Sequence, residues 1–294
     1  MPGLNLQGAS AIVTGAGSGI NLAFAQALVA KGCSVLIADI SLRPEARAFV
    51  DSVAQKGGSG PKVVFEPTDV TDWAQLEKSF EVAKREFGAV PDLVCPGAGI
   101  YEPPTSGFWG DVDSPSHYKH FDINLVHPIK MTRMAIRHLM RAKKTGTVVL
   151  IASVAAETVS FITPLYQASK HGVGSFVMGM AAAEQACGVR VVGVAPGPIA
   201  TPLLMEDPGV AGWVDPTKDT LLSPTVIADA MIALAENPRD KYPPGTLLEV
   251  IDEPPASWRV IPLFNNPGPT RLNLVSGKDG AMSTVLKILK EDAE

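Results

Sequence analysis

The stretch AIVTGAGSGI, residues 11–20, sets the fold that the rest of the chain has to adopt. An apolar run ends in Thr14, glycines follow at positions 15, 17 and 19, and an amphipathic segment covers residues 20–30. In a strand that passes through a glycine-rich turn into a helix, backbone N–H groups at the positive helix end can approach a pyrophosphate. These residues therefore predict a βα unit with a dinucleotide-binding turn, although a merely flexible loop is the alternative.

The same alternation of strand and helix patterns continues along the chain. Further β-branched, apolar runs of strand length occupy residues 33–39, 62–66, 92–95, 147–151, 189–194 and 246–251. Amphipathic segments of helical length separate them, which is typical of parallel βαβ units. We therefore expect one α/β domain over residues 1–294, with a doubly wound, seven-stranded parallel sheet of the Rossmann type and helices on both faces.

Asp39 ends the second predicted strand, about twenty residues after the glycines, where a carboxylate can accept both hydroxyls of an adenosine ribose. A 2′-phosphate would be repelled there. Neither Arg nor Lys occupies Ser18, Ile40 or Ser41 to neutralise such a phosphate. These residues favour NAD over NADP.

A hydroxyl, a phenol and an ammonium group are placed for proton transfer between residues 153 and 170. Tyr166 and Lys170 are four positions apart in an Ala-rich segment, so a helix puts both on one face. Ser153 follows the strand pattern at 147–151 and is expected at the ligand-binding edge of the sheet. Each feature occurs by chance in many proteins, but the glycine turn at the other end of the chain favours a functional site.

Composition and charge exclude several classes of function. The chain has 294 residues, is 46% hydrophobic, and carries a formal charge of −5 from 25 basic and 30 acidic residues without long runs. We expect neither a nucleic-acid nor a membrane partner, because no basic cluster and no apolar run of roughly 18 residues is present. Cys33, Cys95 and Cys187 are widely spaced, which predicts buried thiols, no metal site and a cytoplasmic location.

With these motifs in place, the chain resembles the short-chain dehydrogenase/reductase family from about Leu6 to Glu253. The resemblance implies a catalytic tetrad in which Tyr166 is the acid/base, Ser153 hydrogen-bonds the reacting oxygen, Lys170 holds the nicotinamide ribose and Asn124 anchors a water. It also implies cofactor contacts at Gly15, Gly17, Ser18, Gly19, Ile20, Asp39, Asp69, Val70, Gly97, Ala98, Gly99, Tyr166, Lys170, Pro196, Gly197, Ile199 and Thr201. Asp69 is alternatively a simple helix cap. Within the family, residues 166–176 and 224–237 are similar to 15-hydroxyprostaglandin dehydrogenases and fungal secondary-metabolite dehydrogenases.

Two positions depart from the family pattern. The third turn glycine is Asn21 here, and the usual Asn-Asn-Ala-Gly loop begins Pro96-Gly97. Neither change removes a catalytic atom, but Asn21 adds a side chain where helix and sheet pack closely. Two rival functions therefore stay open: a dinucleotide-binding regulator without turnover, and a cyclase or isomerase that uses bound cofactor without redox chemistry.

The loops indicate the substrate and the mobile parts. Trp109, Phe161, Leu204 and Trp213 are the expected substrate contacts, and they fit a bulky, mostly apolar secondary alcohol or ketone. Residues 201–222 are long for a strand-to-helix connection and predict a lid. Residues 254–294 form a C-terminal extension with a helical pattern near its end. The Ala-, Gly- and Met-rich helix at 172–186 has few charges, which predicts a homodimer or homotetramer.

Overall fold

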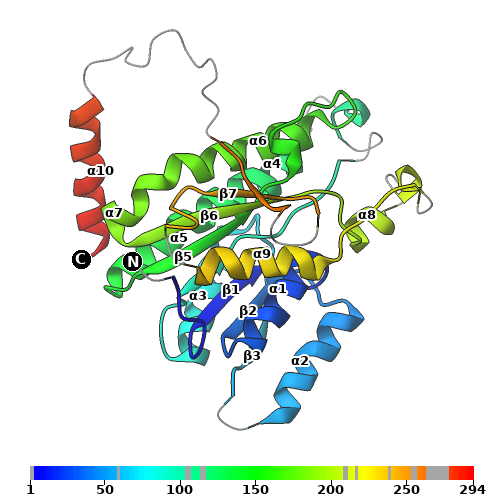
Figure 1. Cartoon of the computed structure of the whole chain (residues 1–294). Helices are drawn as coiled ribbons and strands as arrows, with labels where there is room; N and C mark the ends of the chain where they lie inside the picture. The colour runs from blue at the N-terminus through cyan, green and yellow to red at the C-terminus, as the bar shows by residue number, and fades with distance from the viewer. Residues whose placement is uncertain are drawn as a thin grey trace.

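The computed structural model describes residues 3–57, 60–102, 107–112, 117–207, 211–215, 218–237, 240–252, 257–262 and 278–294. A twisted sheet runs through the middle of the molecule with helices on both sides (Figure 1). This arrangement confirms the α/β fold expected from the alternating strand and helix patterns.

Strand order explains where a ligand can bind. The parallel strands are β1 (Ser10–Thr14), β2 (Ser34–Asp39), β3 (Val63–Pro67), β4 (Leu93–Cys95), β5 (Gly146–Ile151), β6 (Val189–Pro196) and β7 (Leu247–Val250), and the sheet runs β3-β2-β1-β4-β5-β6-β7-β8. The order reverses between β1 and β4, so the crossover helices leave toward opposite faces there. In sheets of this type the crevice at the carboxyl ends of those two strands is the binding position.

The seven predicted parallel strands are present, and among the described residues one further strand joins them. β8 (Arg259–Val260) pairs antiparallel with β7, and both of its residues are exposed. It has no apolar run that a strand pattern could detect. Arg259 instead ties it down through ion pairs with Glu157, at 2.7 Å, and with Glu249 of β7.

The helices form two layers. The helical segments are α1 (Gly19–Ala30), α2 (Pro44–Lys56), α3 (Trp73–Phe87), α4 (Lys119–Phe121), α5 (His127–Arg141), α6 (Pro164–Gly179), α7 (Ala183–Cys187), α8 (Pro202–Met205), α9 (Pro224–Glu236) and α10 (Lys278–Asp292). Side chains of α1 and α9, such as Phe24 and Met231, pack on one face of the sheet. Side chains of α3, α5 and α6, such as Phe80, Met131 and Val177, pack on the other.

The helix predicted around Asn124 contains a π-helical turn at Asp122–Val126, between α4 and α5. Pro128 accounts for this turn, because it has no N–H to donate to the carbonyl of Asn124 and its ring would clash with that carbonyl. Turns of this kind inside helices are frequent at functional sites. The predicted helix around Tyr166 is also interrupted, by a 3₁₀ turn at Met180–Ala182.

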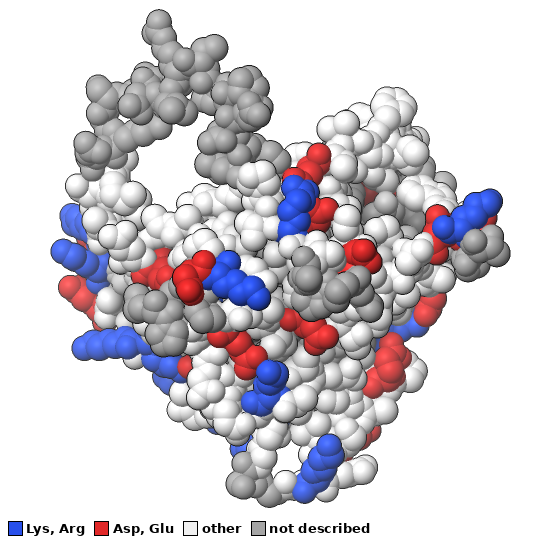
Figure 2. Space-filling view, in the orientation of Figure 1, with Lys and Arg blue, Asp and Glu red and all other residues white. Residues whose placement is uncertain are grey.

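The C-terminal helical pattern forms α10, which lies against α5 and α7 (Figure 1). Asp292 pairs with Arg133 of α5 at 2.5 Å, and Leu289 packs against the core. Among the described residues, no helix has the length and hydropathy needed to cross a bilayer. Basic and acidic side chains are interspersed on the face shown in Figure 2, so that face has no single-sign patch.

Candidate active site

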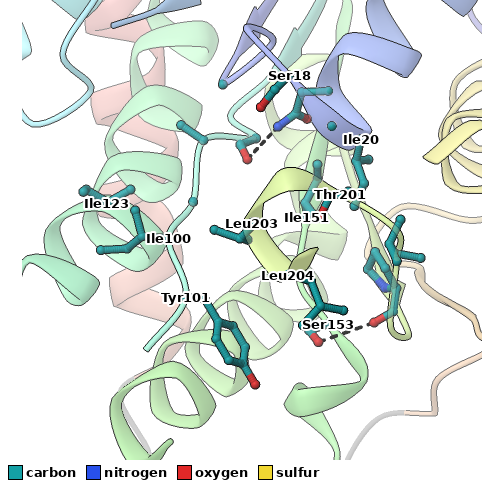
Figure 3. Close-up of a pocket in the computed structure, with 18 of the residues that line it drawn as sticks. Ser18, Ile20, Ile100, Tyr101, Ile123, Ile151, Ser153, Thr201, Leu203 and Leu204 are labelled. Atoms are coloured by element: carbon teal, nitrogen blue, oxygen red, sulfur yellow. Dashed lines mark hydrogen bonds between the residues drawn. The ribbon is translucent and has the colours of Figure 1, made fainter. Parts of the chain in front are cut away.

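A cleft of about 810 Å³ opens at the carboxyl ends of the central strands. One end lies over the glycine turn and Asp39, and the other is bordered by Tyr101, Leu203 and Leu204. Figure 3 shows Ser18 and Ile20 at the first end, with Tyr101, Leu204 and Ser153 toward the second. The cleft therefore joins the two regions that the sequence predicts to be functional.

The glycine turn has the shape that a pyrophosphate needs. Gly15 and Gly19 have φ angles of 71° and 60°, a backbone conformation that other residues rarely adopt. A Cβ on Gly17 would lie 2.2 Å from the carbonyl oxygen of Ser41. The Ser18 side chain makes no capping bond to α1, and no acidic residue lies in the first turn of that helix. The positive end of α1 is therefore directed at the cleft, which fits an anionic cofactor group.

Asp39 lies on the cleft wall, where its carboxylate is already held in place. Its Oδ2 accepts from the Gly17 N–H at 2.8 Å and its Oδ1 from the Ser41 N–H at 3.3 Å. Arg43 also lines this end of the cleft, and sequence inspection of the positions beside Asp39 missed it. Its guanidinium pairs with Glu206 at 2.5 Å and with Glu45 at 3.4 Å, so two carboxylates offset its charge.

The remaining predicted cofactor residues come together in the same cleft. Apart from Gly17, which lies directly behind Asp39, all of them line it: Gly15, Ser18, Gly19, Ile20, Asp69, Val70, Gly97, Ala98, Gly99, Tyr166, Lys170, Pro196, Gly197, Ile199 and Thr201. The helix cap on α3 is Asp72, whose Oδ1 accepts from the N–H groups of Ala74 and Gln75. Asp69 is therefore not the cap: its Oδ1 accepts from the N–H and the hydroxyl of Thr71, and the residue lines the cleft.

Asn21 and Gly97, the two departures from the family pattern, contact each other. The Asn21 amide donates to the carbonyl of Gly97 at 2.8 Å. A Cβ on Gly97 would lie 2.2 Å from Asn21 Oδ1, so only glycine fits beside this asparagine. Compared with the family pattern, the helix therefore has an added side chain at position 21. This side chain occupies the space that a side chain at position 97 would need.

We expect this pair to be energetically coupled. Gly97→Ala should lower cofactor affinity and stability in the wild-type background and be much less harmful in an Asn21→Gly background, because the clash is then gone. Contacting residues of this kind show coupling energies of about 0.5–3 kcal/mol. Urea denaturation and cofactor titration of the two single variants and the double variant measure the coupling. Strictly additive effects would contradict it.

The predicted proton-transfer residues gather on the floor of the cleft. Ser153 lies two residues after the end of β5, accepts from the Ala155 N–H at 3.1 Å, and donates to the carbonyl of Pro196 at 3.4 Å (Figure 3). Lys170 Nζ lies 5.6 Å from the centre of the Tyr166 ring and donates to the carbonyl of Ile151 at 3.0 Å. The spacing of four residues on α6 accounts for this shared face.

Asn124 lies behind these residues rather than in the cleft lining. Its Oδ1 accepts from the Ile100 N–H, and its Nδ2 donates to the Ile100 carbonyl, both at 2.8 Å. Both ends of the amide therefore help to fix residue 100. An asparagine in this π-helical turn is explained by that pair of bonds.

Burial governs the titration of Tyr166 and Lys170. It raises the pKa of Tyr166 to about 12, although a hydrogen bond with the Ser153 hydroxyl acts in the opposite direction. It lowers the pKa of Lys170 to about 8. A positive charge on Lys170 or on oxidised nicotinamide would favour the phenolate of Tyr166. In the cofactor-free protein, desolvation is the largest effect on the pKa of Tyr166, and burial also disfavours the charged form of Lys170.

The four predicted substrate contacts separate into two groups. Leu204 lines the cleft, but Trp109, Phe161 and Trp213 lie outside its lining. The Trp109 ring packs against the Phe161 ring in a tilted arrangement, with centroids 4.5 Å apart, and its indole N–H donates to the carbonyl of Phe161 at 2.8 Å. Trp213 meets the edge of Tyr101 at 6.0 Å. Trp213 thus reaches the cleft border through Tyr101, whereas Trp109 and Phe161 contact each other.

Sequence inspection also missed Glu102, which is fully buried although it is acidic. Its Oε2 accepts from the backbone N–H of Tyr166 at 2.7 Å. A carboxylate inside an irregular loop has no sequence signature, because exposed acids in loops look the same. The unusual apolar neighbourhood of the residue was the only available signal.

Comparison with known proteins agrees with this geometry. A family model described as short chain dehydrogenase matches residues 9–208, which covers the glycine turn, Asp39 and the Ser153–Tyr166–Lys170 cluster. The chain belongs to the short-chain dehydrogenase family. It is therefore an oxidoreductase that acts on alcohols or ketones.

Its relatives in this family differ in what they act on. The chain is 33% identical over 195 residues to galactitol 2-dehydrogenase of Agrobacterium fabrum, an alignment that covers 66% of this chain and 72% of the relative. It is 29% identical over 249 residues to 15-hydroxyprostaglandin dehydrogenase [NAD(+)] of Bos taurus, covering 80% and 88%. It is 30% identical over 243 residues to (+)-borneol dehydrogenase 1 of Salvia officinalis, covering 79% and 88%.

Proposed function

We propose that this short-chain dehydrogenase moves a hydride between NAD and a bulky, mostly apolar secondary alcohol or ketone. The observation that carries the proposal is the convergence of Ser153, Tyr166 and Lys170 on the floor of one cleft whose other end holds the glycine turn and Asp39. A redox reaction of this type needs both a proton-transfer group and a dinucleotide site within reach of each other.

Each residue of the cluster has a distinct part. When bound, the nicotinamide cofactor supplies the hydride chemistry. Tyr166 Oη exchanges the proton with the substrate oxygen, and Ser153 Oγ hydrogen-bonds that oxygen. The ammonium of Lys170, 5.6 Å from the Tyr166 ring centre, favours the phenolate when it is charged. Asn124 fixes the loop at Ile100 through its two bonds, and we infer that its backbone carbonyl, which Pro128 cannot engage, holds a water.

Asp39 should decide the choice between NAD and NADP. Asp39→Ala removes the acceptor for the ribose hydroxyls and the repulsion of a 2′-phosphate, so we expect discrimination for NAD to fall by about 1–3 kcal/mol. Titration of both cofactors into the variant and the wild type measures it. Asp51→Asn, which removes an exposed carboxylate from α2, is the control for net charge. Tighter binding of NADP than NAD by the wild type would contradict the proposal.

The lining of the substrate end supports the apolar class. Ile100, Tyr101, Leu203 and Leu204 border it, and Figure 3 shows their side chains around the same space. These four side chains are apolar apart from the Tyr101 hydroxyl, so a polyol would find few partners among them. We therefore favour a substrate nearer in character to borneol or a prostaglandin than to galactitol.

The test is cofactor absorbance near 340 nm, followed against a panel of alcohols and ketones graded by size and polarity. Turnover of bulky apolar members with NAD is the expected result. A chain that binds NAD tightly but never changes that absorbance would be the regulator. Product formation without net redox change would identify a cyclase or isomerase.

Three further expectations complete the proposal. Residues 201–222 act as a lid: Thr201, Leu203 and Leu204 already border the cleft, and the Arg43–Glu206 pair links α8 to the loop after β2. The positions 208–210 and 216–217 of that segment lie outside the described residues.

We also propose that the chain forms a homodimer or homotetramer and works in the cytoplasm.

A further inference from the structure

Glu102 is a buried carboxylate that no step described so far uses. Its exposed fraction is 0%. One oxygen, Oε2, accepts from the Tyr166 N–H at 2.7 Å, and the other, Oε1, accepts from the Phe108 N–H at 3.0 Å. A buried acid is costly unless hydrogen bonds compensate it, so a chain keeps one where its two acceptors are needed.

The bond to Tyr166 completes the first turn of α6. The helix begins at Pro164, and its N-cap residue Thr163 makes no side-chain capping bond. The first backbone bond of the helix runs from the Gln167 N–H to the carbonyl of Thr163, at 3.1 Å. The Tyr166 N–H precedes it and has no partner within the helix. Glu102 supplies that partner from another part of the chain, at the positive end of the helix where an anion is favoured.

Glu102 also ends a short segment that contacts the proton-transfer residues one after another. Ile100 is held by both amide atoms of Asn124. The carbonyl of Tyr101 lies 2.9 Å from His120 Nε2, and its ring packs 4.7 Å from the ring of Tyr166. Glu102 then accepts a hydrogen bond from the backbone N–H of Tyr166 itself. Residues 100–102 therefore connect Asn124 to Tyr166 along a path of direct contacts.

We propose that Glu102 is a positioning residue for proton transfer. It holds the backbone of Tyr166 and the backbone of Phe108, the first residue of a 3₁₀ turn at Phe108–Gly110, in one fixed arrangement. This role of Glu102 rests on the proposed function, in which Tyr166 exchanges the proton with the substrate oxygen. Misplacement of a reacting group by about 1 Å can cost on the order of 10²-fold in rate. The proposal therefore predicts a loss in kcat rather than in cofactor binding, because the glycine turn and Asp39 lie at the other end of the cleft.

Two variants disturb the same bonds in different ways. Glu102→Gln keeps the size of the side chain, but its amide has one acceptor atom for two N–H donors. Gly107→Ala leaves Glu102 intact and displaces it, because the added Cβ would lie 2.3 Å from Glu102 Cγ and 2.5 Å from Oε1. Each should lower kcat, expressed per cofactor-binding site, by roughly 10–100-fold. The Kd for NAD should stay unchanged within about twofold. The double variant should be no worse than the more severe single one.

Two controls separate positioning from stability alone. Asp92→Asn removes a carboxylate that accepts from the Ser10 N–H at 3.0 Å and pairs with Lys144 at 2.8 Å. Asp92 directly precedes β4, at the amino ends of the strands and away from the cleft. It should lower Tm without lowering kcat per folded site. Gly179→Ala places a Cβ into open space at the end of the same helix α6, so it should leave kcat unchanged and should not lower Tm.

The outcomes distinguish the two proposals. If wild-type enzyme turns over and both Glu102→Gln and Gly107→Ala keep its kcat per NAD-binding site, Glu102 is only structural and the inference is overturned. If Glu102→Gln fails to fold, Gly107→Ala alone decides. If wild-type enzyme turns over no alcohol or ketone, the proposed function fails. Exchange of the Tyr166 amide hydrogen then tests the bond itself: it should be faster in Gly107→Ala than in Gly179→Ala, and equal rates would refute it.

Discussion

Tyr166→Phe is expected to lower kcat by roughly 10²–10⁴-fold while the chain stays folded and binds NAD as before. The substitution removes one oxygen, and the ring that packs 4.7 Å from Tyr101 is retained. The lost atom is the one that exchanges a proton with the substrate oxygen, and among the described residues no carboxylate or imidazole hydrogen-bonds Ser153 to take its place. Single-turnover rates of nicotinamide reduction, normalised to bound cofactor, measure the effect.

The matched control is Tyr242→Phe, which removes the hydroxyl of a buried tyrosine outside the cleft lining. It should leave kcat unchanged. A Tyr166→Phe variant that kept more than a few per cent of the wild-type rate would show that another group moves the proton. Loss of NAD binding together with activity would instead indicate that the ring, and not the hydroxyl, is the essential part.

Lys170→Met should make the cofactor-free protein more stable relative to wild type at pH 7 than at pH 10. Burial lowers the pKa of Lys170 from 10.5 to about 8. Below pH 8 the amine is protonated in both the folded and the unfolded chain, so folding must bury a charge. Between pH 8 and 10.5 only the unfolded chain holds the proton, and wild-type stability therefore rises with pH through this window.

The size of that change follows from the gap between the two pKa values, at about 1.4 kcal/mol for each pH unit. The free energy of unfolding of Lys170→Met minus that of wild type should thus fall by about 3 kcal/mol across the window. Urea denaturation over a pH series measures it, with Lys84→Met on the exposed side of α3 as the control. A difference that does not vary with pH would show that Lys170 titrates alike in both states. The variant should also lose turnover.

Local patterns in the sequence were enough for the α/β fold and for most of the site. Strand and helix periodicity, with a glycine turn after the first strand, led to the parallel order, because short connections leave few ways to bury such elements. The position of Asp39 at a strand end and the spacing of Tyr166 and Lys170 on one helix face are also local features. A local feature needs no knowledge of what packs against it.

Only the tertiary structure decided the features that depend on two distant segments meeting. The role of Asn21 became clear only from the carbonyl of Gly97, which lies 2.8 Å from its amide nitrogen. The charge that Arg43 adds to the cleft became clear only from Glu206, which pairs with it. Glu102 looked like any loop acid until its oxygens were found on the N–H groups of Tyr166 and Phe108. β8 formed from two exposed residues because the edge of β7 was available. The pKa of Tyr166 is raised because desolvation depends on burial by the whole fold, which no stretch of sequence specifies alone.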